Sequence, residues 1–203
     1  MIWNVRRISG VYLLGAALNL GVGLGVGLGV GVARAQSEDH AMSNVEVDKL
    51  RDAAYVPSDR LAVFIKILDS RSKSIDGLLA KKRKPGREQD LHDLYDQFSA
   101  IADELTDNLD EYGPKHRDIR RALPKLVEAT ERWATTLRAA ADDPAYNVVR
   151  KLALDSVRDV HDVAAKMQTE QLAYFTAHPE AVKTEQDRIS NTPTKQEPID
   201  LPR

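Results

Sequence analysis

Apolar residues recur at intervals of three and four along most of the chain between residues 58 and 177, which is the spacing of one face of an α-helix. Turn-forming groups that contain proline interrupt this pattern three times, at Pro85-Gly86, Gly113-Pro114 and Asp142-Asp143-Pro144. The pattern therefore predicts four helices of similar length, which cover residues 58–83, 87–112, 115–141 and 144–177.

The connections between these helices are short, so each helix is expected to lie antiparallel to its neighbours. The predicted fold class is all-α, an antiparallel up-down-up-down four-helix bundle over residues 58–178. Trp133 shares the apolar face of the third helix with Leu126 and Leu137, which places it in the predicted core. Pro124 lies inside the same helix and predicts a kink or a short break, because proline removes a backbone hydrogen bond.

Two polar segments flank the predicted bundle. Residues 36–57 show only weak periodicity and predict a polar N-terminal segment that is partly helical. Residues 179–203 are polar and rich in proline, which predicts a disordered C-terminal tail.

Residues 1–35 have the composition of a leader rather than of a folded element. Glycine alternates with valine or leucine from Gly21 to Gly31, which is the period of a strand, but the flanking residues favour a different interpretation. A basic start, an uncharged run and a small-x-small end together predict a cleaved secretory signal peptide. The alternative is an uncleaved membrane anchor, since the uncharged run exceeds the roughly 20 residues that span a bilayer. The residues of the expected cleavage site are Ala33, Ala35 and Gln36.

Composition narrows the classes of function. The chain has 29 basic and 31 acidic residues, and loss of the leader would remove three arginines and no acid, changing the net charge from −2 to −5. This acidic balance in an exported protein argues against binding of nucleic acid. The chain has no cysteine, so it has neither disulfides nor a thiol nucleophile. No motif of a catalytic serine, a phosphate-binding loop or a dinucleotide-binding turn is present.

The second predicted helix is the most biased segment, because nine acids there face only one basic residue, Arg87. One interpretation is a site for a divalent metal or a cationic peptide. The favoured interpretation is a solvated face that the basic third helix neutralises, since no calcium-loop spacing occurs. The adjacent basic loop either binds an anionic lipid head or wall polymer, or compensates the dipole of a helix end. The candidate interaction surface consists of Lys81, Lys82, Arg83, Lys84, Arg87, Asp103, Asp107, Asp110 and Glu111.

The sequence predicts an exported helical bundle that is not an enzyme and that binds an envelope protein or an anionic envelope polymer. No cofactor is expected, and contact with a membrane is expected only through an uncleaved leader. The main alternative is a metal- or haem-binding bundle, in which His92 would face His161. A hydrolase of wall polymers that uses paired carboxylates is a third hypothesis.

Overall fold

The computed structural model describes residues 41–191, and this part of the chain contains six helices and no strand. The expected signal peptide with Ala33, Ala35 and Gln36 lies outside the described residues, as does the end of the expected tail, 192–203. The helices are α1 (Asn44–Asp52), α2 (Pro57–Ala80), α3 (Arg87–Tyr112), α4 (Leu123–Arg138), α5 (Asn147–Ala177) and α6 (Pro179–Ser190).

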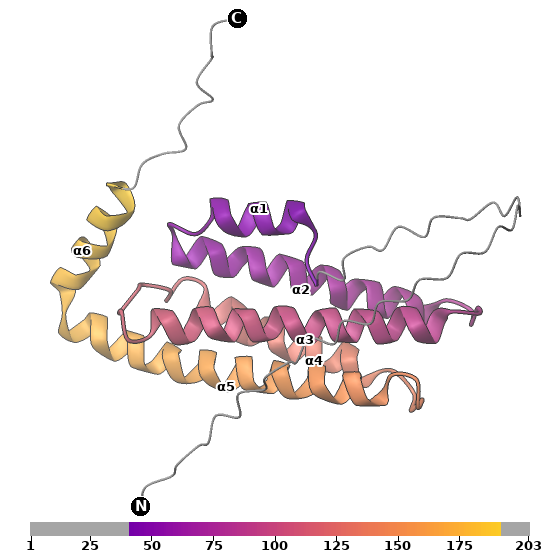
Figure 1. The fold of residues 1–203 in the computed structure, drawn as a ribbon. Helices are drawn as coiled ribbons and strands as arrows, with labels where there is room; N and C mark the ends of the chain where they lie inside the picture. The colour runs from indigo at the N-terminus through magenta and orange to yellow at the C-terminus, as the bar shows by residue number, and fades with distance from the viewer. Residues whose placement is uncertain (1–40, 192–203) are drawn as a thin grey trace, which may run out of the picture. The chain divides into compact units, whose positions relative to one another are not determined.

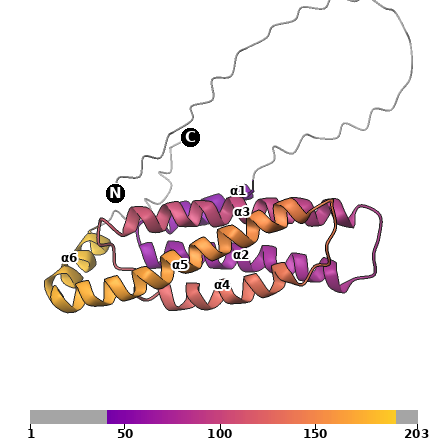
Figure 2. The same ribbon diagram turned by 90° about the horizontal axis from the view of Figure 1, so that it is seen from below.

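Four long helices enclose the core. α2 and α5 each pack against both α3 and α4, whereas α1 lies on α2 and α6 contacts only the end of α5 among the helices (Figures 1 and 2). Trp133 of α4 is 1% exposed and meets Phe98 of α3 edge-on, with 5.7 Å between the ring centroids. The prediction that Trp133 belongs to the core is therefore confirmed.

Side-chain contacts fix the direction of α2 relative to α3. Near the start of α2, a guanidinium nitrogen of Arg60 lies 3.9 Å from Glu104, late in α3. Further along α2, Arg71 donates a hydrogen bond of 3.0 Å to Gln97, which is earlier in α3. The two helices therefore run antiparallel, as their short connection predicts.

α2 and α4 also lie side by side, but they run in the same direction. The Ser58 hydroxyl donates to the backbone oxygen of Asp118 just before α4, and the Trp133 indole donates to Asp69 at 2.7 Å. An up-down-up-down order gives these two helices the same direction, but the expectation that consecutive helices are neighbours is wrong for α3 and α4. The connection between α3 and α4 covers residues 113–122. It is long enough to carry the chain across the core, so α3 and α4 do not lie side by side.

The third predicted helix begins later than the sequence suggested. We expected it to cover 115–141, but α4 covers Leu123–Arg138, and Pro124 lies in its first turn. Proline is tolerated there because the first backbone N–H groups of a helix have no partner within it. Pro124 therefore lies at the start of the helix and does not interrupt it. Gln171 of α5 holds the preceding loop by accepting from the backbone N–H of Ile119 at 3.1 Å and donating to the oxygen of Arg117 at 2.8 Å.

The other boundaries differ by smaller amounts. α3 has the bounds predicted for it, 87–112, and α5 ends at 177 as expected but begins at 147 instead of 144. α2 ends at 80 instead of 83, because the chain becomes extended at Lys81. Within 36–57, the helix α1 is present as the expected helical part.

Residues 179–190 are helical, which corrects the prediction that the whole tail is disordered. Pro179 opens α6 in a position where proline fits a helix. Glu185 of α6 is only 4% exposed, and it accepts a hydrogen bond of 2.7 Å from Arg117 and another from Arg188. The polar composition that indicated disorder includes the carboxylate that attaches this helix to the rest of the protein.

Candidate functional site

The short helix α1 is attached to α2 by both polar and apolar contacts. Its first turn has a capping box, in which Ser43 and Glu46 exchange hydrogen bonds with each other's backbone N–H. Arg71 of α2 donates two hydrogen bonds of 2.9 Å to the Glu46 carboxylate and a third, of 3.0 Å, to the Ala41 oxygen. Leu50 is 3% exposed and packs into the core. These contacts make α1 a fixed wall along one side of α2.

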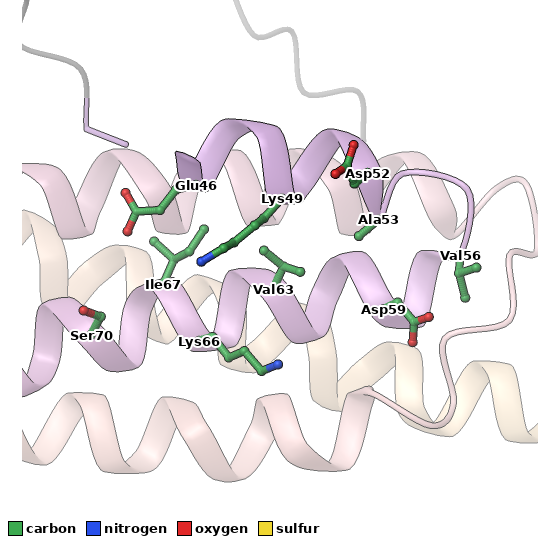
Figure 3. Close-up of a pocket in the computed structure, with 10 residues that line it drawn as sticks. All are labelled: Glu46, Lys49, Asp52, Ala53, Val56, Asp59, Val63, Lys66, Ile67 and Ser70. Atoms are coloured by element: carbon green, nitrogen blue, oxygen red, sulfur yellow. The ribbon is translucent and has the colours of Figure 1, made fainter. Parts of the chain in front are cut away.

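An open groove of about 610 Å³ lies between α1 and α2 (Figure 3). Val63 and Ile67 of α2 form an apolar floor, and Ala53 and Val56 of the connecting turn extend it. The volume falls in the range of small-molecule sites, which combine apolar walls with a few polar groups. The residues lining the groove are Glu46, Lys49, Asp52, Ala53, Val56, Asp59, Val63, Lys66, Ile67 and Ser70.

Within the part of the chain that the structure describes, some of the charged side chains around the groove have ion-pair partners, and others do not. Glu46 is bound to Arg71, and Asp59 is bound to Arg121. Within residues 41–191, neither Lys49 nor Lys66 makes an ion pair.

Lys49 is the cation that the groove positions. Figure 3 shows its side chain extending from α1 into the space between the helices and toward Ile67, whereas Lys66 extends below α2. A cation beside an apolar floor suits a ligand that has both an anionic group and an apolar part.

The Glu46 carboxylate makes the attachment of α1 sensitive to pH. Burial alone would raise the pKa of Glu46, but hydrogen bonds from Arg71 and Ser43 outweigh it and hold the pKa below the ordinary value of 4.5. A carboxylate with a lowered pKa stabilises the folded state above its unfolded pKa, and that contribution is lost as the pH falls through its folded pKa. We therefore expect α1 to stay attached above about pH 4.5 and to detach progressively at lower pH.

Amide hydrogen exchange of residues 46–52, measured from pH 6 to pH 3, tests this prediction. The Glu46→Gln variant is the control, because its α1 should already exchange faster at pH 6 and should show no further loss of protection on acidification. If α1 of the unmodified protein keeps its full protection until the whole protein unfolds in acid, the prediction is contradicted.

A second cavity, of about 580 Å³, lies beneath α6, where Leu172, Val182 and Ile189 supply apolar surface. Its two cations are already paired, Arg120 with Asp118 and Arg121 with Asp59. Among its described lining residues, this cavity therefore has no unpaired cation for an anionic ligand, in contrast to the groove between α1 and α2.

The predicted basic cluster lies in the connection between α2 and α3. Lys81, Lys82 and Lys84 are exposed, and within the described part of the chain they make no ion pair. Arg83 pairs with Glu88 at 2.8 Å and approaches Asp143 at 3.8 Å. Arg87 is directed back at the loop, where it donates to the Lys81 oxygen at 3.5 Å.

The predicted acidic cluster lies near the other end of α3. Asp103, Asp107 and Asp110 are exposed, and between residues 41 and 191 they have no ion-pair partner. Glu111 pairs with Lys115 at 2.5 Å, and that hydrogen bond lowers the pKa of Glu111. Because α3 rises about 1.5 Å per residue, roughly 24 Å of helix separates Arg87 from Asp103. The structure does not bring the two clusters together into one surface.

The third predicted helix does not neutralise the acidic face of α3 as expected. Four of its arginines pair elsewhere, because α3 and α4 do not lie side by side. The pairs are Arg117 with Glu185, Arg120 with Asp118, Arg121 with Asp59, and Arg132 with Glu128 and Asp69.

The two histidines considered as metal or haem ligands are not brought together. His92 contacts its neighbour Asp93 at 3.2 Å, while His161 contacts Thr130 of α4 at 2.9 Å. Among the described residues, no group of three or more histidine, cysteine or acidic side chains is placed to hold a metal ion.

Sequence reasoning missed the groove between α1 and α2. The signal for α1 was present as Ser43-x-x-Glu46, the pattern of a capping box, but it lies in a segment with weak periodicity. The contact of Glu46 with Arg71, 25 residues later, had no local signal.

Comparisons with models of known protein families, with curated proteins and with solved structures find no match for this chain. None of the helices between residues 41 and 191 has both the length and the apolar character needed to cross a bilayer.

Proposed function

We propose that the protein is an exported binding module of the cell envelope, without enzymatic activity, that takes an anionic amphiphile in the groove between α1 and α2. The observation that carries this proposal is the position of Lys49, an uncommitted cation beside an apolar floor. In the proposed complex, the acidic head of the ligand binds Lys49 and its chain lies on Val63 and Ile67. The scaffold is a four-helix bundle made by α2, α3, α4 and α5.

Two physical arguments support this ligand class. Burying an acyl chain contributes about 0.8 kcal/mol per CH₂ group, so a floor of valine, isoleucine and alanine favours an apolar tail. A charged hydrogen bond to an ammonium group adds roughly 1.5–3 kcal/mol and selects an anionic head.

Dodecanoate is a suitable probe, and the Lys49→Met variant tests the proposal. We expect this change to weaken dodecanoate binding roughly tenfold in calorimetric titrations, because methionine keeps the apolar stem and removes the charge. Dodecanol should bind both proteins equally.

Lys73→Met is the matched control. Lys73 is an exposed lysine of α2 that does not line the groove, so its replacement should leave dodecanoate binding unchanged. Equal loss of binding in the Lys49 and Lys73 variants would show a general effect of charge and would contradict the proposal.

A second candidate function is the binding of an anionic envelope polymer by the basic loop. It is favoured by the exposure of Lys81, Lys82 and Lys84 without ion pairs in the described residues. The loop does not line the groove, so variants of Lys49 should leave polymer binding unchanged. The metal- or haem-binding alternative is separated from both by an absorption spectrum and metal analysis of the purified protein.

Export itself predicts a defined N-terminus. When the chain is expressed in a secreting host, the protein outside the cytoplasm should begin at Gln36, because the small residues Ala33 and Ala35 precede that position. Intact mass measurement checks this expectation. Recovery of the full-length chain in the membrane fraction would instead support an uncleaved anchor.

A further inference from the structure

A separate groove of about 420 Å³ runs between α4 and α5. Ala134, Leu154 and Val157 give it apolar walls, and polar side chains from both helices border it. It shares no residue with the groove between α1 and α2. Its lining also includes Thr130, Glu131, Thr135, Arg138, Arg158 and His161.

Thr130 fixes the tautomer of the neutral His161 side chain. The threonine is 1% exposed, and its hydroxyl donates to the backbone oxygen of Val127 at 2.6 Å. A hydroxyl group has a single proton, so at its 2.9 Å contact with His161 the Thr130 oxygen has to accept. The hydrogen-bond pattern therefore assigns the proton of the neutral imidazole to Nδ1 and leaves Nε2 as an acceptor.

The groove lined by His161 is also lined by the cation Arg138. Within residues 41–191, the guanidinium of Arg138 makes no ion pair. Arg158, by contrast, is held by Asp155 at 3.0 Å and by Asp159 at 3.2 Å. The groove thus combines the accepting Nε2 of His161, the guanidinium of Arg138 and an apolar wall, and the Glu131 carboxylate also borders it.

We infer that this groove binds a small hydroxycarboxylate with an apolar side group. Its carboxylate pairs with Arg138, because a guanidinium matches both oxygens of a carboxylate. Its hydroxyl donates to Nε2 of His161, and its apolar part lies on Leu154 and Val157. Thr130 is a positioning residue, which acts by holding the imidazole in the accepting form.

A matched pair of ligands isolates the hydroxyl contact. We would titrate the full chain with 3-phenyllactate and with 3-phenylpropanoate, which lacks the hydroxyl, and follow the methyl resonances of Leu154 and Val157 by NMR. The hydroxy acid should bind roughly three- to tenfold more tightly, the equivalent of one hydrogen bond. Because both ligands are also anionic and partly apolar, the resonances of Val63 are followed separately to report binding in the groove between α1 and α2.

Three substitutions separate the roles of the residues. His161→Phe should abolish the preference for the hydroxy acid, and Arg138→Gln should weaken both ligands by a similar factor. Thr130→Val should reduce the preference without removing the imidazole. Thr106→Val is the control, because Thr106 also bonds a backbone oxygen of its own helix, that of Ala102 at 3.1 Å, but does not line the groove.

The tautomer is tested in the unmodified protein, so the result does not depend on the folding of any variant. At pH 8.5, where histidine side chains are ordinarily neutral, side-chain ¹⁵N NMR should show the proton of His161 on Nδ1. Finding the proton on Nε2 would overturn the inference. Equal affinity for the two ligands, or an undiminished preference in the His161→Phe variant, would overturn it as well.

Discussion

Replacing Trp133 by alanine is expected to lower the free energy of unfolding by roughly 3–5 kcal/mol, the range for truncation of a large aromatic residue in a core. Trp133 is 1% exposed and contacts Phe98 edge-on, so the substitution leaves a cavity within the core. It also removes the indole N–H that donates to Asp69. Urea denaturation followed by circular dichroism measures the change.

One further variant separates the hydrogen bond from the packing of the ring, and another serves as a control. Trp133→Phe keeps most of the ring and loses the 2.7 Å hydrogen bond to Asp69, for which we expect a loss of roughly 1.5–3 kcal/mol. Leu152→Ala truncates an apolar side chain that is 52% exposed, and it should change stability by less than about 0.5 kcal/mol. An unchanged urea midpoint for Trp133→Ala would contradict the core assigned to this residue.

The second large effect is expected at the ion pair that attaches α6. Arg117→Met leaves the Glu185 carboxylate, which is 4% exposed, without its partner at 2.7 Å, while Arg188 of α6 itself remains bound to it. Removing one partner of a buried pair costs roughly 3–5 kcal/mol when the remaining charge has no other partner. Because Arg188 still binds Glu185, we expect a loss below that range. Since α6 contacts only α5 among the helices, we expect a local result in which α6 detaches while the core remains folded.

Amide exchange of residues 180–190 should accelerate by up to roughly a hundredfold in Arg117→Met, with little change in α3. The double variant Arg117→Met with Glu185→Met should recover part of the protection, because an apolar pair carries no desolvation cost. Unchanged exchange in α6 of the single variant would show that the ion pair does not attach this helix.

The sequence predicted those features that depend on neighbouring residues. Periodic apolar positions and turn residues located α3 at both ends, and the apolar face of the third helix identified Trp133 as a core residue. These signals are local because side chains three and four apart share a helix face.

The features that the sequence did not predict depend on contacts between distant residues. The Arg117–Glu185 pair spans 68 residues, and it attaches a helical segment that was expected to be disordered. Gln171 holds the loop at Ile119 from 52 residues away, so that α4 begins at Leu123. Periodicity carries no information on such pairs. It also carries none on which helices pack together, so it did not predict that α3 and α4 are not neighbours.

The candidate binding site also depends on contacts between residues that are distant in the sequence. The basic loop and the acidic face are each visible as runs of charge, but roughly 24 Å of α3 separates them, so they do not form the single surface that the sequence predicts. The groove beside Lys49 exists because Arg71 binds Glu46 and holds α1 along α2. A groove between two helices requires the position of both helices, which the weakly periodic segment around α1 did not provide.

The most direct test of the proposed binding site is to locate a bound amphiphile. A fatty acid with a nitroxide label on its chain broadens the NMR signals of nearby methyl groups. We expect it to broaden the methyl signals of Val63 and Ile67, which form the floor of the groove, and to leave those of Val182 and Ile189 beneath α6 sharp. Broadening confined to Val182 and Ile189, or no selective broadening at all, would contradict the assignment of the binding site to the groove between α1 and α2.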